Sequence, residues 1–158
     1  MTNRQRVGNF PDDGINQAVG SFIADVLELA GLFRRTADEI AGEEGETQTR
    51  WYALSAFSAD PLTVSQAARR LGTTRQAVQR TADELIERGL ATAQPNPDHR
   101  TSPFISLTPE GFALLERISA RAAESRQRWL PEPDPAELDA AHELVRDLCD
   151  ALREELRA

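Results

Sequence analysis

Two helix start signals lie close together in the middle of the chain, and they constrain the fold more than any other feature. Thr63 is followed three residues later by Gln66. Thr73 is followed in the same way by Gln76. Threonine and glutamine at this spacing form a capping box, in which each side chain bonds the backbone N–H of the other residue. Because Gly72 breaks the first helix, the sequence predicts two short helices joined by one tight turn.

The spacing of small residues across this turn is typical of a helix-turn-helix unit. Ala68 is small enough for a close crossing, Gly72 follows four residues later, and Val78 packs the second helix on the first. Many helical pairs carry this set by chance, so the spacing alone leaves an ordinary helical hairpin open. The second helix has further apolar positions at Ala82, Leu85 and Ile86, and Gly89 is its expected left-handed end.

A β-hairpin is predicted directly after the second helix. Residues 90–94 (LATAQ) and 103–107 (PFISL) are short strand candidates, and the segment between them is rich in turn-forming residues. A helix-turn-helix followed by a hairpin is the order of a winged helix. At the wing tip, Arg100 can enter a DNA minor groove, and Asp98 can orient it by a charge-assisted bond. The alternative is a solvated turn with an idle ion pair.

Long amphipathic helices flank this centre. Apolar residues recur in steps of three and four over 15–41, and shorter patterns cover 47–58, 108–129 and 134–157. Thr108-Pro109 and Asp134-Pro135 are start signals for the last two helices. The expected fold class is mainly α with a small β-hairpin wing (α+β). Residues 1–14 are expected to be a flexible tail.

Charge is unevenly distributed along the chain. The formal net charge is −8, whereas residues 64–105 hold six arginines against four acidic residues, a local balance of +2. The rest of the chain therefore carries −10, which permits one locally basic face for nucleic acid but not binding by the whole surface. A chance fluctuation is the competing explanation.

Composition excludes several classes of protein. No apolar run approaches the length of a membrane span, and the N-terminus lacks the apolar core of a secretory signal, so a cytoplasmic location is expected. The single cysteine, Cys149, shares a face with Val145 and Leu152 and is expected to be buried. No metal site, cofactor or enzyme signature is found, so we expect none.

Residues 63–111 resemble the MarR family of winged helix-turn-helix transcriptional regulators. The resemblance rests on L-I-E-R-G-L at 85–90, D-x-R at 98–100 and L-T-P-E-G at 107–111. It implies a homodimer that binds double-stranded DNA, with 15–41 and 108–158 as dimerisation helices and 47–107 as the DNA-binding part of a single domain, 15–158. Two features depart from the family: the first wing strand has no basic residue, and Pro103 removes a hydrogen-bond donor from the second.

In such a fold the second helix lies in the major groove with its start facing the bases. Arg75 and Gln79 share one face and are the expected base contacts, since Arg suits guanine and Gln suits adenine. Thr73, Thr74 and Arg80 are the expected phosphate contacts. The full expected DNA-binding set is Thr73, Thr74, Arg75, Gln76, Gln79, Arg80, Asp98 and Arg100.

The resemblance also implies a small aromatic effector that releases a repressor from a palindromic operator. Phe22, Trp51, Phe57 and Phe112 are candidates to line its cleft, or are plain core residues. The competing hypothesis is a winged helix that binds protein and not DNA, which the acidic flanking helices and the weakly charged wing keep open.

Overall fold

The computed structural model describes residues 14–99, 101–130 and 132–157. The chain divides into two compact units, Met1–Ala120 and Arg121–Ala158. The helices and strands found in the described residues are α1 (Gly14–Gly42), α2 (Gln48–Ser58), β1 (Leu62–Thr63), α3 (Val64–Leu71), α4 (Arg75–Glu87), β2 (Ala91–Gln94), β3 (Phe104–Leu107), α5 (Pro109–Trp129) and α6 (Pro135–Glu155). Of the expected tail, Gly14 already belongs to α1, and the remainder lies outside the described residues.

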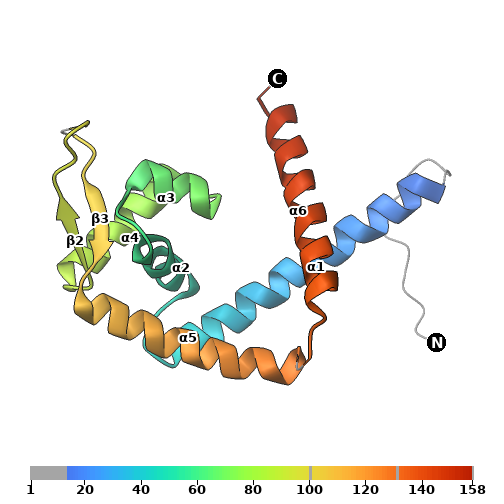
Figure 1. The fold of residues 1–158 in the computed structure, drawn as a ribbon, viewed down its shortest axis with the longest axis horizontal. Helices are drawn as coiled ribbons and strands as arrows, with labels where there is room; N and C mark the ends of the chain where they lie inside the picture. The colour runs from blue at the N-terminus through green and yellow to red at the C-terminus, as the bar shows by residue number, and fades with distance from the viewer. Residues whose placement is uncertain (1–13, 100, 131, 158) are drawn as a thin grey trace. The chain divides into compact units, whose positions relative to one another are not determined.

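The core of the first unit lies among α2, α3, α4 and the sheet. Figure 1 shows α3 and α4 beside the β2–β3 hairpin, with α2 next to them. The largest fully buried side chains are Leu54, Phe57, Leu85, Ile105 and Ile118. The predicted inward residues of α4, Val78, Ala82 and Leu85, are all buried. The predicted winged helix-turn-helix, mainly α with a small β wing, is confirmed.

The wing belongs to a three-stranded antiparallel sheet in the order β1-β3-β2. The hairpin was predicted, and Ala91 pairs with Leu107 and Gln94 with Phe104. The strand β1 was not predicted. It consists of two residues that pair with Ile105 and Phe104, so it depends on a partner strand distant in sequence and leaves no local pattern.

The helix ends follow the predicted local chemistry with one exception. Thr63 and Gln66 form the predicted capping box at α3. The second box is wrong by one residue, because Thr74 rather than Thr73 is the N-cap of α4 and accepts from the Ala77 N–H at 3.2 Å. Thr73 is drawn back into the turn, where its N–H bonds the Ala68 carbonyl oxygen at 3.1 Å.

The start of α5 is fastened to the end of α4. The Thr108 hydroxyl donates to the Gly89 carbonyl oxygen at 2.7 Å, and the Thr108 N–H donates to the Leu90 carbonyl oxygen at 3.1 Å. The same hydroxyl oxygen accepts from the Gly111 N–H at 3.1 Å, which caps the helix. Gly89 has a φ of 71°, so the predicted left-handed end of the preceding helix is confirmed.

The apolar faces of α1 and α6 are largely uncovered within one chain. Only Gly20, Ala37, Ile40 and Ala41 of α1 are buried, whereas Val19, Ile23 and Leu27 are 47%, 48% and 68% exposed. No described residue of α6 is buried. These two helices are among those predicted to form a dimer, and a single chain does not test that prediction. Cys149, which was predicted to be buried, is half-buried in the single chain.

Candidate nucleic-acid interface

The start of α4 is presented to solvent by the turn between α3 and α4. Gly72 adopts a left-handed φ of 62° and ends α3. Ala68 and Val78, the pair predicted to allow the close crossing, are both buried. This packing fixes one side of α4 against α3 and leaves its opposite side free for a partner.

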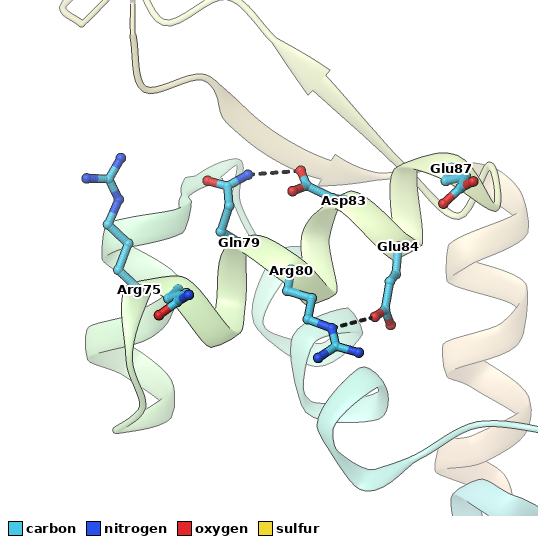
Figure 2. Close-up of a pocket in the computed structure, with 7 residues that line it drawn as sticks. Arg75, Gln79, Arg80, Asp83, Glu84 and Glu87 are labelled. Atoms are coloured by element: carbon cyan, nitrogen blue, oxygen red, sulfur yellow. Dashed lines mark hydrogen bonds and ion pairs between the residues drawn. The ribbon is translucent and has the colours of Figure 1, made fainter.

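The expected contact residues around this helix start are all exposed: Thr73, Thr74, Arg75, Gln76, Gln79 and Arg80. The last four line one open hollow of about 690 Å³. Figure 2 shows that three acidic residues of α4, Asp83, Glu84 and Glu87, complete its lining. The structure thus brings the expected helix residues together on one surface. This surface is basic near the N-terminus of α4 and acidic near its C-terminus.

No role was predicted from the sequence for the acidic residues of this surface. The Gln79 Nε2 donates to Asp83 Oδ1 at 2.9 Å, and the Arg80 Nε donates to Glu84 Oε1 at 3.2 Å. Both pairs are four residues apart on a helix, which is the spacing at which side chains meet. That spacing is the sequence signal that would have found them.

Arg75 differs from Gln79 and Arg80, which are both paired with acidic residues of α4. Within the part of the chain that the structure describes, its guanidinium has no hydrogen-bond or ion-pair partner, and Figure 2 shows it extending away from the helix. The free N–H groups of a helix start carry partial positive charge. Arg75 therefore adds a positive charge to the N-terminal end of α4, which already favours anions.

Behind α4, a buried carboxylate binds two arginines. The Glu46 side chain is fully buried just before α2, and it accepts from Arg50 Nε at 2.6 Å and from Arg88 Nη1 at 2.9 Å. A second bond joins Arg88 Nη2 to Glu46 Oε1. Burial by itself would raise the pKa of Glu46, but the bonds from Arg88 and Arg50 outweigh it and hold this pKa below its ordinary value.

The ion pairs continue from this carboxylate to the exposed surface of α4. The Arg50 Nη1 lies 3.6 Å from Glu84 Oε2, and Glu84 in turn holds Arg80. The bond to Glu46 raises the pKa of Arg88 at the C-terminal end of α4. Residues far apart in the sequence thus fix both the end of α4 and the acidic part of its outer surface.

The wing tip is shaped by an asparagine that sequence reasoning missed. Asn96 is buried, its Nδ2 donates to the Ser102 carbonyl oxygen at 3.0 Å, and its Oδ1 accepts from the Asp98 N–H at 3.0 Å. These bonds form an Asx turn that places Asp98 at the exposed tip. Arg100 lies outside the described residues, and so does its expected pair with Asp98.

The four aromatic candidates for an effector cleft have different environments. Phe57 is 1% exposed and belongs to the core, whereas Phe22 and Phe112 are 37% and 42% exposed. Trp51 is half-buried, with its ring centroid 5.6 Å from that of Tyr52. None of the four lines the hollow at α4.

No group of three or more His, Cys, Asp or Glu side chains in the described part of the chain is placed to hold a metal ion. No helix among the same residues is long and apolar enough to cross a membrane.

A helix-turn-helix with an attached wing, presenting one face of α4, defines the winged helix class. Residues 45–100 match the model of the MarR family. An uncharacterized protein of Mycobacterium tuberculosis is 47% identical over 141 residues, which cover 89% of this chain and 99% of that protein. The chain belongs to the MarR family of winged helix proteins, and its fold is that of transcription regulators rather than of enzymes.

Solved structures share this fold over most of the chain. The MarR/EmrR family transcriptional regulator from Acinetobacter sp. ADP1 is 25% identical with a TM-score of 0.73, over 85% of this chain and 96% of that one. CouR from Rhodococcus jostii RHA1, bound to p-coumaroyl-CoA, is 20% identical with a TM-score of 0.69, over 80% of this chain and 90% of that one.

Proposed function

We propose that the protein is a homodimeric transcriptional regulator that binds a palindromic DNA operator and acts as a repressor in the cytoplasm. The observation that carries the proposal is the outer surface of α4, where Arg75, Gln76, Gln79 and Arg80 are exposed together at the helix start. A helix presented in this way fits the major groove, with its first turns toward the bases. The acidic remainder of the chain, with its net charge of −8, disfavours indiscriminate binding to nucleic acid.

The DNA contact proposed for each side chain follows from which of its polar atoms are already hydrogen-bonded within the chain. Arg75 is exposed and has no partner among the residues that the structure describes, and its guanidinium fork suits the O6 and N7 atoms of guanine. Gln79 uses its amide nitrogen on Asp83, so its carbonyl oxygen remains free to accept from an amino group of adenine or cytosine. Thr73, Thr74 and Arg80 border the helix start and are the proposed phosphate contacts. At the wing, Arg100 is the proposed minor-groove contact, and Asp98 is proposed to orient it by a charge-assisted bond.

The experiment that tests this function is selection of random duplex DNA by the purified protein at two salt concentrations. Enrichment of a two-fold symmetric motif, with half-sites about one helical turn apart, would establish sequence-specific binding by a dimer. Affinity that falls steeply with salt would show phosphate contacts. Absence of enrichment at low salt would reject the proposal in favour of a winged helix that binds protein.

Arg75→Ala is expected to weaken binding to the selected motif by about 1–3 kcal/mol and to relax the preference at one base pair in each half-site. The reason is loss of a bidentate contact to one base. Binding is measured by titration of labelled duplexes that vary at each position. Arg117→Ala is the control, because Arg117 is an exposed arginine of α5 that pairs with Glu44 rather than lying on α4. Unchanged affinity and preference in Arg75→Ala would show that the recognition face is misassigned.

The second copy of the chain is proposed to cover the exposed apolar faces of α1 and α6. In α6 these residues include Leu144, Val145 and Leu148, which are 51%, 48% and 40% exposed. Soluble monomers rarely leave such continuous apolar stripes in water. Two long helices with uncovered faces therefore favour an obligate dimer, which also supplies the two recognition helices that a palindrome requires.

Leu148→Asp is expected to raise the dimer dissociation constant by at least about 100-fold, because it buries an unpaired charge in an apolar interface. Sedimentation velocity over a range of protein concentrations measures this change. His142→Asp adds a carboxylate on the charged face of the same helix and is expected to leave the dimer intact. A dimer equally stable in both variants would place the interface elsewhere.

A small aromatic molecule is the proposed effector class. The fold is shared with CouR, whose structure contains p-coumaroyl-CoA. Release of the selected DNA by aromatic acids or their thioesters, measured by fluorescence anisotropy, tests this part of the proposal. Phe57 is excluded from the effector site because it is fully buried in the core.

A further inference from the structure

We propose that Arg50 is a positioning residue for DNA binding: its ion pair with the Glu84 carboxylate weakens the hold of Glu84 on Arg80, so that Arg80 can exchange onto a DNA phosphate. The inference rests on the proposed DNA-binding function of α4. It adds a residue of α2 that touches no DNA and still controls a phosphate contact.

The carboxylate of Glu84 is shared between two arginines. Its Oε1 accepts from Arg80 Nε at 3.2 Å, and its Oε2 lies 3.6 Å from Arg50 Nη1. Figure 2 shows Arg80 lying along Glu84 on the surface of α4. An arginine in this position is not a free cation, so a phosphate must compete with Glu84 for it.

The two arginines differ in their freedom to move. The Arg50 side chain is 25% exposed, and its guanidinium is fixed through Nε, which lies 2.6 Å from the buried Glu46 carboxylate. The Arg80 side chain is 84% exposed and makes only the Glu84 contact among the described residues. Arg50 is therefore the fixed partner of Glu84, and Arg80 is the exchangeable one.

The exchange has a simple electrostatic basis. When a phosphate approaches, Arg80 moves from Glu84 to the phosphate oxygens. Glu84 would then be an unpaired anion close to the DNA backbone, but Arg50 keeps it neutralised. Without Arg50, the carboxylate would hold Arg80 more strongly and would repel the phosphate after Arg80 had left.

The test uses the motif enriched by the wild-type protein and measures affinity against salt for single and double variants. Glu84→Gln is expected to strengthen binding about 3-fold, because it frees Arg80 from an exposed ion pair. Arg50→Gln is expected to weaken binding about 3-fold, because Glu84 then holds Arg80 more strongly. In the Glu84→Gln background, Arg50→Gln should have no effect, since the residue through which it acts is gone.

Two controls separate the exchange from general charge effects. Glu87→Gln removes the same charge from the same helix surface, and Glu87 pairs with no arginine among the described residues. It is expected to change affinity less than about 2-fold. In an Arg80→Gln background, the gain from Glu84→Gln should fall to the level of this control.

The outcomes are distinguishable. A wild-type protein that enriches no DNA overturns the proposed function and this inference together. A wild-type protein that binds its motif, with Arg50→Gln equally harmful in both backgrounds, overturns only the inference, because Arg50 would then act directly on DNA or through the fold. Arg50→Gln also loses the bond to Glu46 and can unfold the chain. In that case the Glu84→Gln and Arg80→Gln cycle, which leaves Glu46 untouched, is the test. An equal gain from Glu84→Gln with and without Arg80 overturns the inference, because Arg50 would then have no exchange to control.

Discussion

Glu46→Gln is expected to lower the free energy of unfolding by about 2–3 kcal/mol, although Glu46 lies outside the proposed DNA contacts. Its carboxylate is buried and accepts bonds from both Arg50 and Arg88. An amide of the same shape turns N–H donors toward guanidinium donors and removes the charge that balances them. The loss stays below that of a fully buried pair because Arg50 and Arg88 are 25% and 43% exposed and can turn toward water.

Glu46 also makes the free energy of unfolding depend on pH. The pKa of Glu46 is lower in the folded chain than its ordinary value, so the folded state binds this proton less readily than the unfolded state. Its contribution is fully present above the unfolded pKa of about 4.3 and is lost as the pH falls through the lower folded pKa. The difference between wild type and Glu46→Gln should therefore shrink on acidification through this range.

Urea unfolding at neutral and acidic pH measures both effects at one protein concentration. Glu87→Gln is the matched control, since it removes an exposed carboxylate from α4 and is expected to change stability by less than about 0.5 kcal/mol. Equal stability of the Glu46→Gln variant and wild type at neutral pH would contradict the role assigned to this ion-pair network.

The centre of the fold could be predicted because its signals act over a few residues. The capping box of Thr63 with Gln66 and the left-handed Gly72 and Gly89 are local chemistry. The error at α4 is also local: two adjacent threonines both fit a cap, and the bond of Thr73 to Ala68 decides between them.

Features that depend on distant residues could not be predicted in this way. Glu46 and Arg88 are 42 positions apart, so no local pattern joins them. The strand β1 exists only through its pairing with β3. The pairs that Asp83 and Glu84 form with Gln79 and Arg80 are an intermediate case. Their spacing of four residues is visible in the sequence, but only the positions of the side chains show that the pairs form.

Periodicity also leaves the partner of an apolar face undetermined. Leu148 and its neighbours on α6 were correctly recognised as one stripe, yet in the single chain that stripe is exposed. A repeat of three and four residues indicates that a helix face will be covered, but it does not say by which surface.

Gly111→Ala is expected to destabilise the first unit by about 3 kcal/mol, which corresponds to a fall in melting temperature of about 6–12 °C at fixed protein concentration. A Cβ on Gly111 would lie 2.0 Å from the Leu90 carbonyl oxygen and 3.0 Å from its carbon. These are backbone atoms, so no side-chain rotation relieves the overlap. The Thr108 N–H bonds the same Leu90 oxygen at 3.1 Å, and separating the two segments would break that bond.

Gly42→Ala is the matched control for this variant. Gly42 is also helical, and a Cβ there would meet nothing within 4 Å. The same substitution should stabilise the chain by about 0.4–1 kcal/mol, because alanine restricts the unfolded state more than glycine does. Opposite signs in thermal unfolding would show that close approach of backbone, rather than helix propensity, requires glycine at 111. Stabilisation by both changes would mean that α5 does not pack against the Leu90 carbonyl. The bonds from Thr108 to Gly89 and Leu90 would then not join α5 to the end of α4.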